Sequence, residues 1–226
     1  MRIILCLIVL LATSASADTI AIIGTGDVAR ALGPAFAQQG HTIVYGSREP
    51  GRESVRSLVK ETGTGASATL PTAAVVDADF VVLAVPGLLV GEITRGLGNL
   101  DGKIIIDPTN PLEFEPLTLR HEDGLSNAEL IQSIAPNAHV VKAFNTLNWR
   151  VMVEPELAGG PVSVPLVAND ADAKLAVAKL VMAMGLDPID VGDLQNARWV
   201  EGLSVLLLNN MIKQSEPFNI YLRRSP

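Results

Sequence analysis

The stretch TIAIIGTGDVARALGPAFAQQGHTIVYGSR, from Thr19 to Arg48, reads as a strand, a glycine-rich turn, a helix and a second strand. Its opening run, Thr19–Ile23, is apolar and β-branched, as is typical of a buried parallel strand. The following residues, Gly24-Thr25-Gly26-Asp27-Val28-Ala29, match the G-x-G-x-x-G/A pattern of dinucleotide-binding βαβ units. The alternative interpretation is a glycine-rich turn in some other kind of α/β protein.

The small residues of this turn have separate physical roles in such a unit. Gly24 permits the tight turn, and Gly26 lets a pyrophosphate approach the backbone because it has no side chain. Ala29, with Gly33 one helical turn later, lets the helix pack close to the sheet. The helix N-terminus offers free N–H groups and a positive dipole end to the phosphates. Asp27 puts an acid beside the phosphates, and it could instead serve as the helix N-cap.

The end of the second strand predicts which dinucleotide binds. A site specific for NAD places an acidic residue there, to accept a hydrogen bond from the ribose 2′-OH. This chain has Ser47 and Arg48 at that place, with Arg52 one helical turn later. A hydroxyl and two guanidinium groups would hold a 2′-phosphate, which a carboxylate would repel. The sequence therefore favours NADP(H), the alternative being that both arginines are solvated loop charges.

Composition excludes some classes of function. The formal net charge is −7 and no basic cluster is present, so we expect no nucleic-acid partner. The 226 residues suit one medium domain with a small appendage, and the hydrophobic content of 48% supports a sizeable core. The single cysteine, Cys6, lies near the N-terminus, so the remaining chain offers no cysteine nucleophile, disulfide or cysteine metal site.

Residues 1–17 read as a secretory signal peptide. Met1-Arg2 is a short positive start, Ile3–Leu11 is an apolar segment, and Ala15-Ser16-Ala17 is an A-x-A cleavage signal. We expect cleavage after Ala17 and an exported, periplasmic protein. The alternatives are a membrane anchor through residues 3–11 or a cytoplasmic protein.

Strands alternate with helices along the chain, which favours an α/β fold with a Rossmann-type, doubly wound parallel sheet and a small C-terminal α/β extension. Ligands in such sheets lie beyond the carboxyl ends of the strands. Three expected loops share that edge: Ala84–Gly87, Asp107–Pro111 and Lys142–Thr146. Their small and proline residues allow a flat ring to approach, and they include Val85, Pro86, Asn110 and Ala143. The alternative is that each loop only connects a strand to the following helix.

We divide the chain into the signal peptide 1–17, an NADP-binding domain 18–150 and a small C-terminal portion 151–226. Residues 116–126 are polar and irregular, which predicts a surface loop, and we expect a short helix over 127–134. The helix expected over 194–212 ends in apolar residues and packs onto the sheet or onto a second copy of itself. A homodimer through this helix is therefore a hypothesis.

Few side chains suggest acid–base or metal chemistry, and we predict no metal site. His41 and His139 begin strands and are expected to be structural, whereas His121 lies in a polar loop and is expected to be solvated. Lys142 could approach the site, or be a surface lysine at a strand end. Trp199 could stack on a ring, but a core position on an apolar helix is favoured.

From Thr19 to about Leu208 the chain resembles the NADP oxidoreductases that use the deazaflavin coenzyme. It is similar also to the N-terminal reductase domain of the STEAP metalloreductases. The resemblance is carried by IAIIGTGDVA with GHTIVYGSR, then VVLAVP, DPTNP and VVKAFNT, and finally by ANDADAK and MGLDPIDVGDLQNAR.

The resemblance implies a protein that passes hydride between NADP(H) and a flavin-like partner. It implies that the turn residues Thr25 to Val28 hold the pyrophosphate, and that Ser47, Arg48 and Arg52 hold the 2′-phosphate. Val85, Pro86 and Ala143 would border the nicotinamide. The acceptor, a flavin or deazaflavin as a small-molecule redox partner, stays open. The alternatives are a non-catalytic NADP-binding module or partner of an electron carrier, and an imine reductase like the pyrroline-carboxylate reductases.

Overall fold

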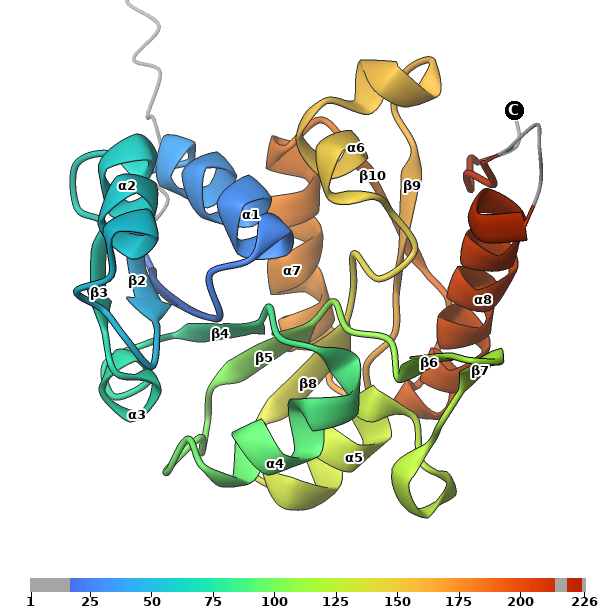
Figure 1. The fold of residues 1–226 in the computed structure, drawn as a ribbon, viewed down its shortest axis with the longest axis horizontal. Helices are drawn as coiled ribbons and strands as arrows, with labels where there is room; N and C mark the ends of the chain where they lie inside the picture. Colours follow the sequence, from blue (N-terminus) through green and yellow to red (C-terminus); the bar gives the residue numbers. More distant parts are fainter. Residues whose placement is uncertain (1–16, 214–218, 225–226) are drawn as a thin grey trace, which may run out of the picture.

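The computed structural model describes residues 17–213 and 219–224, with side chains in the last helix up to residue 209. All of the predicted signal peptide except Ala17 lies outside these residues. A six-stranded parallel sheet in the order β3-β2-β1-β4-β5-β8 forms the centre of the molecule (Figure 1). Its strands are β1 Thr19–Ile23, β2 Thr42–Gly46, β3 Ser67–Thr69, β4 Phe80–Leu83, β5 Ile104–Asp107 and β8 His139–Lys142. The predicted Rossmann-type sheet is confirmed.

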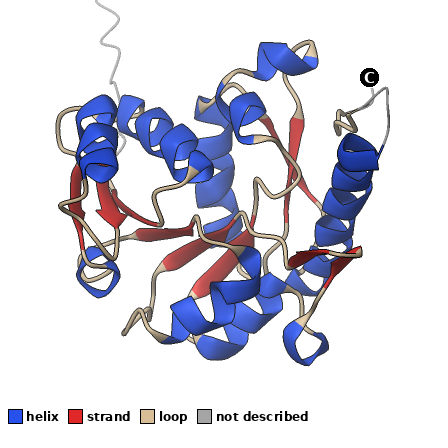
Figure 2. Ribbon diagram, viewed as in Figure 1, coloured by secondary structure: helices blue, strands red, loops and turns tan. Residues whose placement is uncertain are grey.

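Helices cover both faces of this sheet (Figures 1 and 2). On one face lie α1 Asp27–Gln38, α2 Glu53–Thr62, α6 Trp149–Val153 and α7 Ala171–Ala183. On the other lie α3 Pro71–Ala74, α4 Val90–Arg95 and α5 Asn127–Ile134, with η1 Gly87–Leu89 before α4.

The sheet is buried on both faces because successive residues of its strands point to opposite sides. In β1, Ile20 and Ile22 join the hydrophobic cluster formed with α1 and α7. Ala21 and Ile23 join the second cluster, formed with α3, α4 and α5. The continuous apolar runs in the sequence are thus the signature of doubly covered strands.

The C-terminal portion shares a core with the sheet. β9 Ser163–Leu166 pairs in parallel with β10 Asp187–Asp190, and an antiparallel bridge between Lys142 and Val167 connects β8 to this region. Val164 and Val177 belong to the same cluster as Ile20. The position 150/151, where the sequence suggests a boundary, falls within α6.

Between β5 and α5 the structure corrects the predicted surface loop. β6 Leu112–Phe114 and β7 Leu117–Leu119 form an antiparallel hairpin, and η2 Glu122–Gly124 follows. Strands this short carry no readable alternation in sequence. In this hairpin, β7 packs on α8 Ala197–Lys213, a helix that is distant in the sequence. Two short 3-10 helices complete the chain: η3 Pro155–Ala158 follows α6, and η4 Leu194–Asn196 precedes α8.

Candidate functional site

The glycine-rich turn packs directly against the end of β4. Gly24 has φ of +107°, and a Cβ atom there would lie 2.1 Å from the carbonyl oxygen of Ala84. The same Cβ would lie 3.5 Å from Cγ1 of Val85. Only glycine meets both demands, because it tolerates the left-handed conformation and needs no space.

The N-terminus of α1 is open toward this edge of the sheet. A Cβ at Gly26 would meet nothing within 4 Å, which leaves room for a ligand beside the backbone. No side chain caps the helix there, so its first N–H groups are available to phosphate oxygens. The turn therefore fits a pyrophosphate.

The expected capping role of Asp27 is wrong. Gly26 occupies the N-cap position, and Asp27 is the first residue of α1 with an exposed side chain. Its position beside the helix N-terminus is electrostatically favourable for a carboxylate, even without a capping bond.

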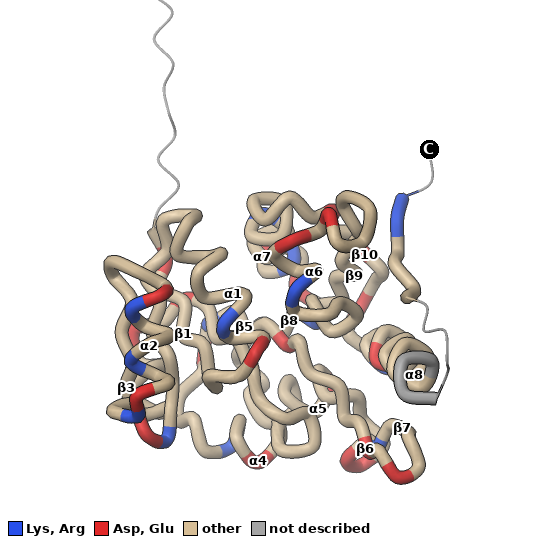
Figure 3. The backbone as a smooth tube through the Cα atoms, turned by 45° about the horizontal axis from the view of Figure 1, so that its top comes forward, with Lys and Arg blue, Asp and Glu red and all other residues tan. Residues whose placement is uncertain are grey.

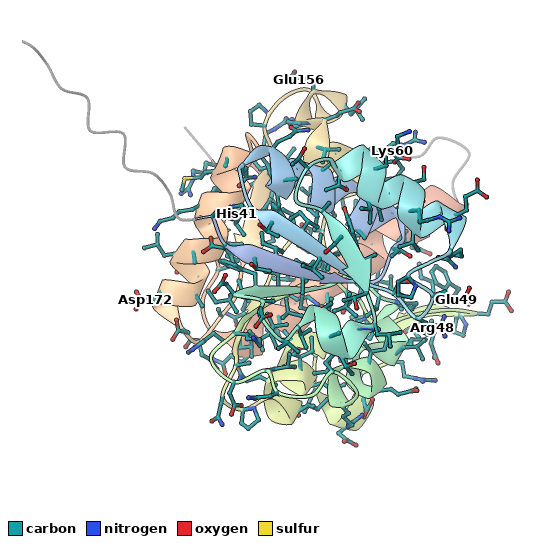
Figure 4. The ribbon with its side chains drawn as sticks, turned by 90° about the vertical axis from the view of Figure 1, so that its left-hand side faces the viewer. His41, Arg48, Glu49, Lys60, Glu156 and Asp172 are labelled. Carbon is teal, nitrogen blue, oxygen red and sulfur yellow. The ribbon has the colours of Figure 1, made fainter. Side chains whose placement is uncertain are left out.

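The segment after β2 carries Ser47, Arg48 and Arg52, and Arg52 reaches the glycine turn. Nη2 of Arg52 donates to Oγ1 of Thr25 at 3.3 Å. Ser47 is buried and its Oγ accepts from the N–H of Glu49, which leaves its hydroxyl proton free to donate. Arg48 is exposed, next to Glu49 on the loop that follows β2 (Figure 4). Basic and acidic segments alternate around α2 and β3 at this edge (Figure 3).

The three loops at the carboxyl ends of β4, β5 and β8 touch one another. A Cβ at Gly87 would lie 1.9 Å from the carbonyl oxygen of Asn110, so the first two loops are in contact. Nδ2 of Asn110 donates to the carbonyl oxygen of Asn145, and Nδ2 of Asn145 donates to Oδ1 of Asn110, each at 2.9 Å. Val85 is half-buried and Pro86 exposed, between the glycine turn and these asparagines.

The loop after β8 is held tightly. Ala143 has no exposed surface, and Phe144 adopts a left-handed backbone with φ of 67°. The Phe144 ring packs edge-on against Phe36 of α1, with centroids 6.4 Å apart, and so secures this unusual conformation. Oδ1 of Asn145 and Oγ1 of Thr146 are buried without a hydrogen-bond partner. Such orphaned polar atoms are the groups that a bound amide would satisfy.

Lys142 is neither a surface lysine nor a site-facing one. Its side chain has no exposed surface, and its Nζ lies 2.8 Å from Oδ2 of Asp107 and 2.7 Å from Oε1 of Glu201. It also donates to the carbonyl oxygen of Thr109. Burial lowers the pKa of Lys142, but the carboxylates of Asp107 and Glu201 outweigh burial and hold that pKa above its usual value. A lysine at a strand end in the sequence gives no sign of this, because Glu201 is distant along the chain.

The histidines fall in two places. His41 pairs with Asp18 at 3.3 Å and His139 with Asp170 at 3.1 Å, at the amino ends of their strands. His121, expected to be solvated, instead lies 3.1 Å from Oε2 of Glu201 with 24% of its side chain exposed. It lines a cavity of about 210 Å³ that Gly87, Asn127 and Arg120 also line.

Trp199 is 72% exposed, so the expected core position is wrong. The buried positions of α8 are Ala197, Val200, Glu201 and Ser204, at helical spacing, which puts Trp199 on the outer face. The prediction that the apolar residues form the buried face of this helix failed, because the buried positions Glu201 and Ser204 are polar.

Three further residues at this edge were not predicted from the sequence: Arg30, Asn127 and Glu201. Arg30 links α1 to α2 through the carbonyl oxygen of Ser54, at 3.3 Å. The start of α5 at Asn127 agrees with the capping box Ser126-x-x-Glu129, but no local signal shows that the Asn127 side chain reaches Gly87 and Thr109. Within 17–213 and 219–224, no group of three or more His, Cys, Asp or Glu side chains could hold a metal ion. No helix in these ranges is long and apolar enough to cross a membrane.

Residues 19–111 match the model of the family described as NADP oxidoreductase, coenzyme F420-dependent. The F420-dependent NADP reductase of Methanothermobacter thermautotrophicus is 31% identical over 212 residues, covering 86% of this chain and 89% of that protein. A solved structure, a putative F420-dependent NADP reductase from Arthrobacter sp. FB24, is 36% identical with a TM-score of 0.78. The aligned part covers 84% of this chain and 91% of the chain in that structure.

The metalloreductase STEAP3 of Rattus norvegicus is 34% identical over 195 residues, which cover 85% of this chain. The aligned part spans only 37% of that relative's length. The fold, the glycine turn and these similarities agree that the chain is an NADP-dependent oxidoreductase, and it belongs to the family of coenzyme F420-dependent NADP oxidoreductases.

Proposed function

We propose that this protein transfers hydride between NADP(H) and a flavin- or deazaflavin-type acceptor. The proposal rests on one observation above all: three loops at the carboxyl edge of the sheet meet beside an open glycine turn. Hydride transfer between two redox rings needs positioning and exclusion of water rather than a protein acid, base or nucleophile. The nicotinamide would supply or take the hydride.

Different residues would hold different parts of NADP(H). Thr25 to Val28 would hold the pyrophosphate through the N-terminus of α1. Ser47, Arg48 and Arg52 would hold the 2′-phosphate, Arg48 and Arg52 with planar forks of donors. The nicotinamide would lie near Val85, Pro86, Asn110 and Ala143, with the unpartnered oxygens of the neighbouring residues 145 and 146 as acceptors for its carboxamide. Because Ala143 is fully buried, its contribution would come from the backbone.

A deazaflavin-type acceptor is supported by the name of the archaeal relative but not by the name of the rat relative. The archaeal relative is named an F420-dependent reductase and the rat relative a metalloreductase. A non-catalytic NADP-binding module, or a partner of an electron carrier, is the competing proposal.

The test has two stages. NADPH and NADH are titrated into wild-type protein and Arg48→Ala by nucleotide fluorescence, and NADPH oxidation is then followed with F420, FMN and FAD. Tight NADPH binding, weakened in the variant, with turnover on one of these acceptors supports the proposal. Binding without turnover on any of the three favours the binding module. Failure to bind either nucleotide would sink both.

A further inference from the structure

Two consecutive residues of α8 hold the end of β8 and the loop that follows it. The carbonyl oxygen of Val200 accepts from Nδ2 of Asn145, in that loop, at 3.1 Å. Oε1 of Glu201 accepts from Nζ of Lys142, the residue immediately before the loop, at 2.7 Å. A helix far along the chain therefore contacts one of the loops beside which the nicotinamide is expected.

The Lys142 ammonium is saturated by fixed partners. It has three N–H donors, and they reach Oδ2 of Asp107, the carbonyl oxygen of Thr109 and Oε1 of Glu201. The Lys142, Asp107 and Glu201 side chains are fully buried, so water cannot replace any of these partners. The positions of the loops after β5 and β8 are thus tied to the carboxylate on α8.

The same carboxylate reaches the third loop through Asn127. Oε1 of Glu201 also accepts from the backbone N–H of Asn127 at 2.9 Å. Nδ2 of Asn127 in turn donates to the carbonyl oxygen of Gly87 at 3.0 Å and to Oγ1 of Thr109 at 2.7 Å. One carboxylate therefore anchors all three loops at the carboxyl edge of the sheet.

We propose that Glu201 is a positioning residue for hydride transfer, whose carboxylate sets the three nicotinamide-bordering loops through Lys142 and Asn127. The proposal rests on the function proposed above. Its physical reason is that hydride transfer depends steeply on the distance between the two rings, and a displacement of about 1 Å can cost about 100-fold in rate. An isolated charge pair far from the chemistry would have no such effect.

Glu201→Gln removes the charge and keeps an oxygen that can accept from Lys142. We expect kcat to fall about 10- to 100-fold, with a larger primary isotope effect from NADPH deuterated at the transferred position. Affinity for adenosine 2′,5′-bisphosphate, which carries the 2′-phosphate but no nicotinamide, should stay within about twofold, because Arg48 and Arg52 are untouched. A merely structural role would change stability without changing the isotope effect.

Arg198→Gln is the matched control. Arg198 lies on the same helix, and its Nη2 pairs with both carboxylate oxygens of Glu129 on α5, at 2.8 and 2.9 Å, rather than with a residue of the three loops. This variant loses an ion pair of α8 but should keep wild-type kcat and isotope effect.

A kcat within twofold of wild type in Glu201→Gln would overturn the positioning role, whatever happens to stability. If Glu201→Gln does not fold, Glu201→Asp, which keeps the buried charges as they are but shortens the side chain that reaches Lys142 and Asn127, is measured against the same criteria. If wild-type protein binds NADPH but reduces no acceptor, the proposed function fails separately. The positioning role is then decided by the fluorescence of bound NADPH, which should change in Glu201→Gln and not in Arg198→Gln; equal fluorescence overturns it.

Discussion

Nη2 of Arg52 lies 3.3 Å from Oγ1 of Thr25, so the N-cap residue of α2 contacts the glycine-rich turn. Arg52 follows the strand that ends near the expected 2′-phosphate position, and Thr25 belongs to the turn expected to hold the pyrophosphate. The contact places the two expected phosphate-binding regions side by side. Because the pair is exposed, it contributes little to stability, and its arginine is free to turn toward a phosphate.

The first prediction concerns this arginine and its neighbour. Arg48→Ala and Arg52→Ala should each weaken NADPH binding about 10- to 100-fold, since a hydrogen bond to a charged group contributes about 1.5–3 kcal/mol. NADH lacks the 2′-phosphate, and its affinity should change little. Fluorescence titration of both nucleotides measures the two constants. An equal loss of NADH and NADPH affinity would contradict the assignment of these arginines to the 2′-phosphate.

Two glycines should respond oppositely to the same substitution. Gly26→Ala meets nothing within 4 Å and should change stability by less than about 1 kcal/mol, yet abolish tight NADPH binding by blocking the pyrophosphate. Gly33→Ala would put a Cβ 1.8 Å from the hydroxyl oxygen of buried Tyr45, and should destabilise the fold by roughly 1–3 kcal/mol. Denaturant unfolding and NADPH titration on both variants separate the effects. Normal NADPH affinity in Gly26→Ala would count against a pyrophosphate at the turn.

Tyr45 should make stability fall at alkaline pH. Burial raises its pKa to about 12 from 10.0, although the hydrogen bond between Tyr45 and Thr62 opposes the shift. A raised folded-state pKa means that the contribution is complete below pH 10 and is lost as pH rises toward about 12. The expected loss is roughly 3 kcal/mol over that interval.

Unfolding curves across this alkaline range test the effect in wild type, Tyr45→Phe and Tyr221→Phe. Tyr45→Phe should lack this part of the alkaline loss, because phenylalanine has no proton to release. Tyr221→Phe should retain it. Identical alkaline behaviour in all three proteins would assign the loss to other groups.

A homodimer through α8 remains our proposal, now with a defined surface. Trp199 and Leu206 are seven residues apart on one face of the helix, and they are 72% and 58% exposed. We expect sedimentation to give a dimer for wild type and a monomer for Trp199→Ser/Leu206→Ser, with unchanged folding. A wild-type monomer across the concentration range would rule out the dimer.

The predicted export signal also has a direct test. The described structure begins at residue 17, and the N–H of Asp18 donates to Nδ1 of His41 at 3.2 Å. Expression with the native N-terminus in a Gram-negative host should yield a periplasmic protein whose first residue is Asp18. Intact mass and fractionation measure both; an unprocessed chain in the membrane fraction would instead support the anchor through residues 3–11.

Local signals in the sequence were enough for much of the fold. The pattern Gly24-x-Gly26-x-x-Ala29 predicted the first βαβ unit because glycine's conformational freedom and small size act within a few residues. The helix over 127–134 agrees with the expected bounds, as its capping box and apolar spacing are local too. The hairpin of β6 and β7 was missed because three-residue strands have no readable period, and β7 packs on a distant helix.

The amino-acid sequence alone determined the parallel sheet, the glycine turn and the basic residues after the second strand that favour NADP(H). Each of these features depends on residues that are neighbours in the sequence. Tertiary structure alone decided that Lys142 is buried between Asp107 and Glu201, that Trp199 faces outward, and that three separate loops share one anchor. Burial of a charge becomes tolerable only when partners from distant elements surround it. That condition is a property of the packed chain, and no window of sequence contains it.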